Sequence, residues 1–340
     1  MIYRSKAPLR IGLAGGGTDV SPYSDLYGGA ILNATISLYA NATIEPLAEN
    51  KIILEAIDRN EQLSFDLMKE LPIDGKLDLL KGIYNRIQKD YGIPQQGFRL
   101  STYVDAPAGS GLGTSSTLVV AIIGAFTEML RLPLGEYDMA HYAYEIERKD
   151  LKLAGGKQDQ YAATFGGVNF MEFYADDKVI VNPLRIKQQY LFELENNLLL
   201  YYTSTSRESA NIIKAQSKNV IDKKDSSIEA MHQLKEQAKL MKEALLKGKL
   251  HDLGEILDFG FQQKRQMVEG ISNPLMEDIY ETARKAGATG GKISGAGGGG
   301  FMIFYCPVNT KYAVIKSLEK FGGRYRRYKF TEHGLTTWTI

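Results

Sequence analysis

The stretch Pro107–Ser116 reads PAGSGLGTSS and joins a predicted strand to a predicted helix. Residues 98–104 before it alternate between apolar and polar side chains, which is typical of a strand. Residues 118–126 after it are almost entirely apolar and predict a helix that begins near Thr114. The sequence therefore places three glycines within five residues on the loop between a strand and a helix.

This loop has the chemistry of an anion-binding site. Glycine lets the backbone approach a ligand closely and adopt positive φ angles. The beginning of a helix adds unpaired N–H groups and the positive end of the helix dipole, and the two together favour a phosphate group. The hydroxyls of Thr114, Ser115 and Ser116 either cap the helix or reach a phosphate-bound magnesium ion. A flexible turn capped by Thr114 or Ser115 is the alternative interpretation.

Two common nucleotide-binding motifs are excluded at this loop. A Walker A motif requires a Lys directly after its last glycine, whereas Thr114 follows Gly113 here. The dinucleotide-binding fingerprint requires the spacing GxGxxG, which the loop lacks. The loop therefore predicts a phosphate site of another kind.

Three further glycine-framed segments flank predicted strands or helices. Residues 13–19 read LAGGGTD, and the terminal carboxylate of Asp19 suits sugar hydroxyls because it has two acceptor oxygens; a tight hairpin turn is the alternative. Residues 290–301 read GGKISGAGGGGF and lie next to a predicted strand, which favours a buried or ligand-facing loop. Residues 155–160 read GGKQDQ, where Asp159 is either a positioned carboxylate or part of an Asx turn outside any helix.

The composition is that of an ordinary globular protein. The chain has 340 residues, enough for two domains, and its 41 Lys and Arg balance its 40 Asp and Glu. This balance gives no argument for nucleic acid or an acidic membrane surface as a partner. The single cysteine, Cys306, excludes a disulfide framework, and four scattered histidines form no HExxH pair. The N-terminal residues MIYRSKAPLR lack a signal-peptide core and no apolar run is long enough to span a membrane, so we expect a soluble, cytoplasmic protein.

Hydrophobic periodicity predicts the other elements. In the first half we expect strands at 2–13 (with a bulge or an edge position at Pro8), 30–38, 40–46, 52–57 and 62–66, helices at 74–91, 114–130 and 135–153, and a hairpin formed by 167–174 and 177–184. After a polar boundary at 185–195 we expect a strand at 197–203, long helices up to Gly270, a helix from Ser272 to Gly287, a strand at 302–306, a helix at 311–321 and a final hairpin. The charged run 145–150 predicts a solvated helix face or one metal ligand.

Taken together, the glycine loops resemble those of the GHMP small-molecule kinases, the superfamily of galactokinase, homoserine kinase and mevalonate kinase. The three family motifs match residues 7–19, 107–116 and 292–301, in the family's order and across nearly the whole chain. Within the superfamily the chain is most similar to the bacterial D-glycero-D-manno-heptose 7-phosphate kinases. That similarity lies in PLRIGLAGGGTD at 8–19, EIERKDLKLAGGKQDQYAATFGG at 145–167 and TSTSRESA at 203–210. Fucokinases share the AGGGTD form of the first loop.

The resemblance implies a fold and a division of the chain. The fold is α+β with two domains, an ATP-binding N-terminal domain at 1–190 with a left-handed βαβ unit and a ferredoxin-like C-terminal domain at 191–340. ATP lies between the two domains.

The resemblance also assigns roles to residues of this chain. ATP is bound by Pro107, Gly109, Ser110, Gly111, Leu112, Gly113, Thr114, Ser115 and Ser116. Mg²⁺ is bound by Ser115 and Glu147. Asp159 faces the acceptor hydroxyl, as a base or as a positioning group, and Arg10 pairs with it. The sugar is bound by Gly15, Gly16, Gly17, Thr18, Asp19, Lys157, Arg207, Gly295, Gly297 and Gly298.

The implied reaction is ATP-dependent phosphorylation of the anomeric hydroxyl of a sugar phosphate, with D-glycero-α-D-manno-heptose 7-phosphate as the first choice. An acceptor that already carries a phosphate needs a second anion pocket, for which Arg207, beside Ser206 and Ser209, is the candidate; a helix cap is the alternative use of these residues. The resemblance leaves a monomer and a homodimer equally open.

Two departures from the family and two other functions are weighed against this prediction. Thr114 stands where many members have Ser, which keeps a hydroxyl. Gly16 and Gly17 stand where galactokinase has Glu-His, which disfavours galactose. The alternative acceptor is an unphosphorylated sugar such as fucose. The alternative class is an inactive ATP- or sugar-binding regulatory protein, which the presence of Ser115, Glu147 and Asp159 disfavours.

Overall fold

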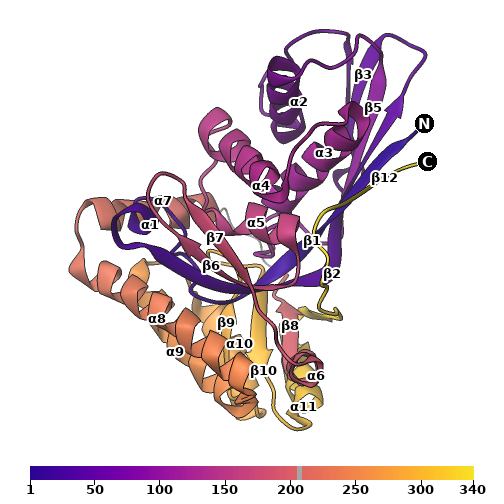
Figure 1. The fold of residues 1–340 in the computed structure, drawn as a ribbon. Coiled ribbons are helices and arrows are strands. Elements are labelled where there is room, and N and C mark those ends of the chain that lie inside the picture. Colours follow the sequence, from indigo (N-terminus) through magenta and orange to yellow (C-terminus); the bar gives the residue numbers. More distant parts are fainter. Residues whose placement is uncertain (205–208) are drawn as a thin grey trace.

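Two β-sheets organise the chain in the computed structural model, which describes residues 1–204 and 209–340 (Figure 1). In these residues the larger sheet has eight strands in the order β12-β1-β2-β5-β3-β4, and β6 pairs with β2 and β7. Its strands are β1 (Tyr3–Ala14), β2 (Gly29–Pro46), β3 (Lys51–Ala56), β4 (Glu61–Asp66), β5 (Phe98–Val104), β6 (Val168–Phe173), β7 (Val179–Pro183) and β12 (Thr336–Thr339). The smaller sheet has the order β11-β8-β10-β9, formed by β8 (Leu198–Tyr202), β9 (Gly290–Ile293), β10 (Phe301–Tyr305) and β11 (Arg324–Arg326).

The helices fall into two groups along the chain. The first group, from the N-terminal half, comprises α1 (Tyr23–Tyr27), α2 (Asp78–Asp90), α3 (Thr114–Leu130), α4 (Glu136–Glu145) and α5 (Gln158–Phe165). The second group comprises α6 (Gln188–Asn197), α7 (Ser209–Ile221), α8 (Asp225–Lys247), α9 (Leu253–Met267), α10 (Pro274–Lys285) and α11 (Thr310–Leu318). Figure 1 shows α2, α3 and α4 beside the larger sheet, and α9, α10 and α11 around the smaller one.

The smaller sheet confirms the predicted ferredoxin-like architecture. Its strands follow the chain as β8, then helices, then β9 and β10, then α11 and β11, which is a βαββαβ unit. Every pairing in it is antiparallel. The division of the chain at residue 190 stays a prediction, and β12 returns from the C-terminal end to pair with β1 in the larger sheet.

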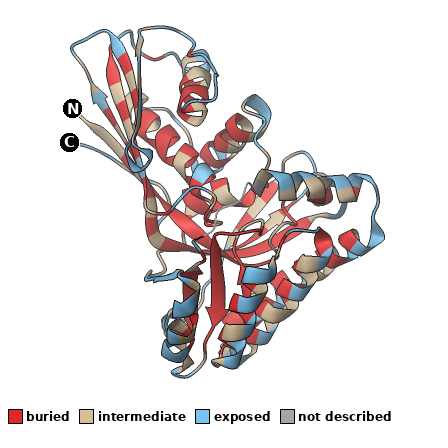
Figure 2. Cartoon of the chain, turned by 180° about the vertical axis from the view of Figure 1, so that it is seen from behind, coloured by how far each residue is buried: buried red, intermediate tan, exposed pale blue. Residues whose placement is uncertain are grey.

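A continuous hydrophobic core connects the two sheets. Leu9 and Ile11 of β1 belong to the same buried cluster as Leu200 of β8 and Ile303 of β10. Side chains alternate across a strand, so the neighbouring Met302 and its companions face a second cluster on the other side of the smaller sheet. Figure 2 shows this burial as red along the strands and on the inner sides of the helices. The shared core holds the loops of both sheets at fixed positions relative to one another.

The expected bulge at Pro8 is confirmed. The pairing of β1 with β2 shifts register between Pro8 and Arg10. Proline has no N–H to donate to the ladder, so it is tolerated where the ladder is interrupted. The edge position is wrong, because β1 lies between β12 and β2. The bulge directly precedes Arg10 in the chain.

Two predicted boundaries between elements in the first half are wrong. The strands expected at 30–38 and 40–46 form one strand, β2, which continues because residues 29–34 pair with β6 and residues 40–46 pair with β5. The helix expected at 135–153 ends at Glu145 and continues as a π-helical turn, Ile146–Asp150. Such turns are frequently found at functional sites.

Three other assignments are corrected by tertiary contacts. Asp159 is in the first turn of α5, not in an irregular segment. The polar boundary at 185–195 contains most of α6, whose Leu194 packs into the core. The final hairpin does not form, because β11 pairs with β8 and β12 pairs with β1. Local patterns carry no information about such distant partners.

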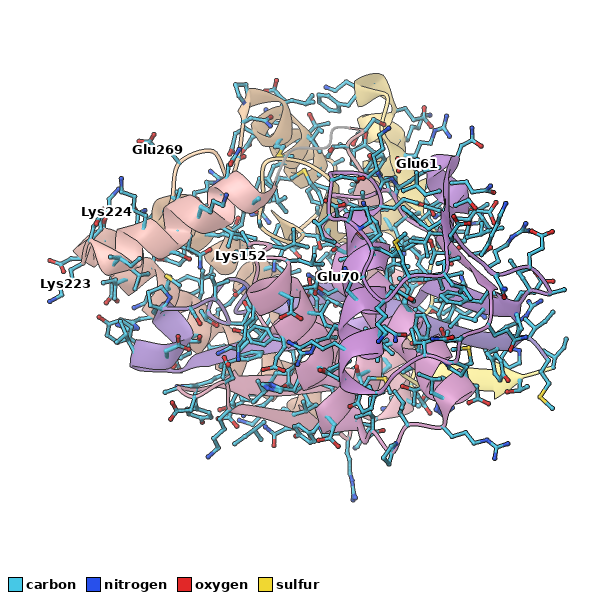
Figure 3. The ribbon with its side chains drawn as sticks, turned by 90° about the horizontal axis from the view of Figure 1, so that it is seen from above. Glu61, Glu70, Lys152, Lys223, Lys224 and Glu269 are labelled. Carbon is cyan, nitrogen blue, oxygen red and sulfur yellow. The ribbon has the colours of Figure 1, made fainter. Side chains whose placement is uncertain are left out.

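The exposed charges are of both signs, in keeping with the balanced composition. Figure 3 labels six charged residues of both signs; Glu70, Lys152, Lys223, Lys224 and Glu269 are exposed, and Glu61 is partly exposed. No helix within residues 1–204 and 209–340 is both long and apolar enough to cross a bilayer.

The loops at 107–116 and 290–301 touch through their backbones, and this contact predicts a stability effect. Gly111 has φ of 83°, and a Cβ on it would lie 2.5 Å from the carbonyl oxygen of Ser294. We expect Gly111→Ala to lower the free energy of unfolding by about 2–4 kcal/mol, through backbone strain plus a clash. Urea denaturation measures the change.

Gly92→Ala is the matched control for this prediction. Gly92 has φ of 73° and nothing within 4 Å of an added Cβ, so its substitution adds strain alone, about 1 kcal/mol. Equal destabilisation by the two substitutions would contradict a close contact between the loops.

Candidate active site

A cavity of about 330 Å³ lies where the glycine-rich loops of both sheets meet. Its lining includes Arg10 from β1, Gly16, Gly17 and Asp19 from the first loop, at 13–19, and Gly109, Gly111 and residues 113–116 from the second, at 107–116. Residues 147–148, 153–156 and 158–159, helices α7 and α9, and β9 with the loop after it complete the wall. The segments that sequence analysis singled out separately therefore surround one space.

The second loop presents the free beginning of α3 to this cavity. Gly113 precedes the helix with φ of 78°, and no side chain caps the first turn, so the predicted cap by Thr114 or Ser115 is absent. The backbone N–H groups of that turn are left for another partner, and a phosphate is the usual one. Gly109, Gly111 and Thr114–Ser116 line the same wall.

Three residues predicted to bind ATP do not line the cavity. Leu112 is buried in the core, and its carbonyl accepts a hydrogen bond from the Arg10 N–H at 3.1 Å. The carbonyl of Ser110 accepts from the Phe301 N–H at 2.9 Å. Pro107 is absent from the lining. The backbone contacts of Leu112 and Ser110 fix the position of the loop between β1 and β10.

Ser115 and Glu147 form a hydrogen-bonded pair on the cavity wall. Ser115 Oγ donates to Glu147 Oε1 at 3.1 Å, and Gln160 Nε2 donates to the other carboxylate oxygen, Oε2. Arg148 Nη1 lies 3.6 Å from Glu147 Oε1. Glu147 is 1% exposed, held by the π-helical turn that follows α4. The pair brings two hard oxygen donors together beside the free beginning of α3.

Arg10 and Asp159 form the second pair, which lies against the loop at 107–116. Arg10 Nε and Nη2 lie 2.7 Å and 2.6 Å from Asp159 Oδ1, and Arg10 Nη1 donates to the Gly111 carbonyl at 2.6 Å. A Cβ on Gly113 would lie 3.1 Å from Asp159 Cγ. The carboxylate is therefore fixed next to the second loop, while Arg10 is 4% exposed.

The first loop supplies a buried carboxylate to the cavity. Asp19 Oδ2 accepts a hydrogen bond from the Gln158 N–H at 3.0 Å, and burial raises the pKa of Asp19. Thr18 turns away from the cavity and bonds to the carbonyls of Gly15 and Ala30. Gly15 also contacts Ala30, where a Cβ would lie 2.0 Å from the carbonyl oxygen, so Thr18 and Gly15 shape the loop without lining the cavity.

Several other predicted sugar-binding residues lie elsewhere. Lys157 is 1% exposed and pairs with Asp25 at 3.2 Å and Asp177 at 3.1 Å, so its charge is already neutralised outside this cavity. Gly298 donates its N–H to the Ile271 carbonyl at 2.7 Å, and Gly297 also packs on Ile271. Gly295 lines the cavity. The predicted anion-binding residue Arg207 lies outside the described residues.

Sequence analysis missed five polar residues of the cavity: Arg148, Gln158, Gln216, Lys264 and Lys292. Lys264 carries a signal that could have revealed it. Helix α9 buries residues at helical spacing, Leu257, Phe261 and Met267 among them, and Lys264 interrupts that apolar face. A charged residue there needs a local reason. For Gln216 on α7 we find no sequence signal.

Lys264 gives a second prediction, on stability. It is 3% exposed, and burial together with the nearby Arg10 charge lowers its pKa to about 8. The unfolded chain therefore holds this proton more tightly, so stability rises with pH between about 8 and 10.5. We expect the free energy of unfolding of Lys264→Met at pH 7 to exceed that of the wild type by up to about 3 kcal/mol. The variant should also lack the increase of stability with pH that Lys264 causes.

Chemical denaturation of both proteins from pH 7 to pH 10.5 measures this effect. Lys239→Met is the control, because Lys239 is 49% exposed in its side chain on α8. A Lys264→Met protein that is less stable than the wild type at pH 7 would contradict the cost assigned to the buried charge.

The residues of the cavity fit a nucleoside triphosphate with magnesium. The unpaired N–H groups at the beginning of α3 fit phosphate oxygens, and Ser115 with Glu147 fits a hard cation. In the part of the chain that the structure describes, no group of three or more His, Cys, Asp or Glu side chains could hold a metal. Mg²⁺ is commonly bound by one or two carboxylates plus substrate phosphates, so one carboxylate suffices.

Comparison with known proteins shows the family to which the chain belongs. The family model of the GHMP kinases N terminal domain matches residues 78–167, and that of the GHMP kinases C terminal domain matches residues 241–323. The D-glycero-alpha-D-manno-heptose 7-phosphate kinase of Campylobacter jejuni is 50% identical over 337 residues, which cover 99% of each chain.

Two further proteins are similar to this chain, one of known structure and one more distant in sequence. A D-glycero-D-manno-heptose 1-phosphate kinase from Bacteriodes thetaiotaomicron, of known structure, is 46% identical with a TM-score of 0.84 over 99% of both chains. The L-fucokinase/L-fucose-1-P guanylyltransferase of Bacteroides fragilis is 27% identical, over 87% of this chain and 34% of its own length. From the two matching family models and the 50% identity, we conclude that this chain belongs to the GHMP kinases.

Proposed function

We propose that this kinase transfers the γ-phosphoryl group of ATP to the anomeric hydroxyl of D-glycero-α-D-manno-heptose 7-phosphate, giving the 1,7-bisphosphate and ADP. The observation that carries the proposal is the Asp159 carboxylate, which Arg10 holds at 2.6 Å next to the phosphate-binding loop. A phosphoryl acceptor must lie between such a carboxylate and the nucleotide. The 50% identity to a heptose 7-phosphate kinase supports the choice of acceptor.

The chain's own residues have separate roles in this proposal. The N–H groups at the beginning of α3 bind phosphate oxygens, and Ser115 with Glu147 holds Mg²⁺, which neutralises charge on the phosphates. Asp159 orients the acceptor hydroxyl and accepts its proton. Arg10 keeps Asp159 in place and offsets negative charge at the reacting group.

The sugar-binding wall consists of Asp19 and Gln158. Both line the cavity, and Gln158 Oε1 is buried without a hydrogen-bond partner among the described residues. An unpaired buried acceptor is costly, so it calls for a donor from the ligand. Sugar hydroxyls donate to carbonyl and carboxylate oxygens, and these two side chains offer both.

Coupled ADP release with Mg²⁺ and ATP across a panel of acceptors tests the proposal. The panel contains heptose 7-phosphate, heptose 1-phosphate, the unphosphorylated heptose, mannose, fucose, galactose and homoserine. Heptose 1-phosphate is included because one similar protein is described as a heptose 1-phosphate kinase. We expect turnover on the 7-phosphate with a kcat/KM at least a hundredfold above that on any other member.

Each other outcome corrects a different part of the proposal. Turnover on heptose 1-phosphate alone would move the phosphorylated position away from the anomeric carbon. Turnover on fucose or free heptose would keep the sugar kinase and reject the phosphorylated acceptor. Binding of ATP without turnover of any member would reject this panel of acceptors and favour a regulatory binding protein.

A further inference from the structure

Two buried lysines face the cavity without a carboxylate partner. Lys264 of α9 and Lys292 of β9 are 3% and 5% exposed, and both line the cavity. Lys264 Nζ donates to the Gly295 carbonyl, and Lys292 Nζ donates to the Gly12 carbonyl at 2.8 Å. Neither ammonium group has an Asp or Glu oxygen within 4 Å among the residues described, unlike the buried Lys157, which has two.

The two ammonium groups lie close to the same point of the first loop. A Cβ on Gly16 would lie 3.7 Å from Lys292 Nζ and 3.8 Å from Lys264 Nζ. Because residue 16 is glycine, that space is left without a side chain. The charges come from two elements of the C-terminal half and meet at a backbone from the N-terminal half.

The charged side chains that line the cavity leave one positive charge in surplus, and it falls on these two lysines. The lining contains Arg10, Arg148, Lys264 and Lys292 against Asp19, Glu147 and Asp159. Asp159 neutralises Arg10, and Glu147 lies 3.6 Å from Arg148. Asp19 is the one remaining carboxylate of the lining for two lysines, and it forms an ion pair with neither of them. Burying a charge without an opposite charge is costly, so the arrangement calls for an anion from outside the chain.

The anion of the nucleotide is already provided for elsewhere. The beginning of α3, Ser115 and Glu147 form the wall at the second loop. The lysines instead adjoin Gly16 and Gly295, and Lys264 lies near enough to Arg10 and Asp19 to feel their charges. This is the side of the cavity where the sugar-binding carboxylate is located.

We propose that Lys264 and Lys292 together bind the phosphate group that the acceptor sugar already carries. This inference rests on the proposed function and names the part of the cavity that selects a sugar phosphate over a free sugar. Lysine binds phosphate as a compact charge with three donors, and two of them at one point can share one phosphate group.

Steady-state kinetics on two acceptors tests the proposal. Lys264→Met, Lys292→Met and the control Lys239→Met are assayed at saturating ATP on heptose 7-phosphate and on the unphosphorylated heptose. We expect each cavity variant to raise KM for heptose 7-phosphate by about 10- to 100-fold, the effect of a lost hydrogen bond to a charged group. We expect kcat/KM on the unphosphorylated heptose to change less than about threefold, and Lys264→Arg to recover part of the loss.

Direct binding separates this inference from the proposed function. Calorimetric titration of heptose 7-phosphate into the enzyme without nucleotide measures the acceptor site alone, whether or not the phosphorylated heptose is the true substrate. We expect the dissociation constant to rise by the same factor in both cavity variants and to stay constant in Lys239→Met. Inorganic phosphate at millimolar concentration should compete in the wild type and not in the variants.

Three results would overturn the inference. Equal losses on both acceptors would place the lysines at the transferring phosphoryl group. Unchanged KM and binding would place the acceptor phosphate elsewhere. Wild-type protein that binds the free heptose as tightly as the phosphate ester would leave no phosphate subsite to explain. By contrast, wild-type protein that binds heptose 7-phosphate through these lysines without turning it over would reject the proposed function alone.

Discussion

Asp159→Asn is expected to lower kcat by about a hundredfold to ten-thousandfold, the usual contribution of a positioned acid or base. Asparagine keeps the shape of the side chain and removes both the negative charge and the ability to accept the acceptor's proton. The carboxylate lies against the second loop and is held by Arg10 at 2.6 Å, so little else in the cavity changes position. Coupled ADP release at saturating ATP and acceptor measures kcat.

The control for this prediction is Asp58→Asn. Asp58 is exposed in the turn between β3 and β4, so the substitution removes a charge of the same kind far from the cavity. Equilibrium binding of ATP to Asp159→Asn should equal that of the wild type if Asp159 acts on the acceptor, as we propose. A kcat within threefold of the wild type would show that another group accepts the proton.

Glu147→Gln is expected to reduce kcat by roughly a hundredfold to a thousandfold at a magnesium concentration that saturates the wild type. A metal ion contributes several kcal/mol to transition-state charge stabilisation, and each 1.36 kcal/mol corresponds to about tenfold in rate. Glutamine fills the same buried space and accepts the Ser115 hydrogen bond through its amide oxygen. Its amide nitrogen then faces Gln160, whose unpaired Oε1 can accept from it once the Gln160 amide turns over. The lost charge therefore acts on the cation more than on the fold.

Magnesium titration distinguishes this role from a structural one. We expect the midpoint of the rate against Mg²⁺ concentration to rise at least tenfold in Glu147→Gln, with partial recovery of kcat at high Mg²⁺. Glu70 is exposed and is labelled in Figure 3, so the control Glu70→Gln should leave the magnesium titration unchanged. A variant with low kcat and an unshifted midpoint would exclude Glu147 from metal binding.

The loop that we propose to bind phosphate could be located from the sequence because its signals are local. Glycines at 109, 111 and 113, directly before an apolar helix, define a loop with free N–H groups whatever the remainder of the chain does. The local pattern made Asp159 a candidate carboxylate and placed one possible metal ligand within 145–150, and the resemblance to the GHMP kinases then assigned their roles to Asp159 and Glu147. The structure places Asp159 in α5 and Glu147 in a π-helical turn, and the helical periodicity of the sequence indicates neither.

Predictions for charged residues failed where the partner is distant. The resemblance made Lys157 a candidate for binding the sugar, yet Asp25 and Asp177 neutralise it. Lys264 interrupts the apolar face of α9, which marks it as unusual but does not indicate the cavity that it reaches. The charge of a residue is given by its type, whereas the groups that neutralise it are determined by how the chain folds.

By itself, the sequence determined the glycine loops, the apolar strands and helices between them and the family to which the chain belongs, because these depend on short patterns and their order. The tertiary structure alone decided that β12 returns to β1, that Thr18 and Lys157 turn away from the cavity, and that Lys264 and Lys292 meet beside Gly16. Each of these depends on contacts between residues more than 100 positions apart, apart from the local bonds of Thr18. Such contacts form only when a shared hydrophobic core brings both sheets together.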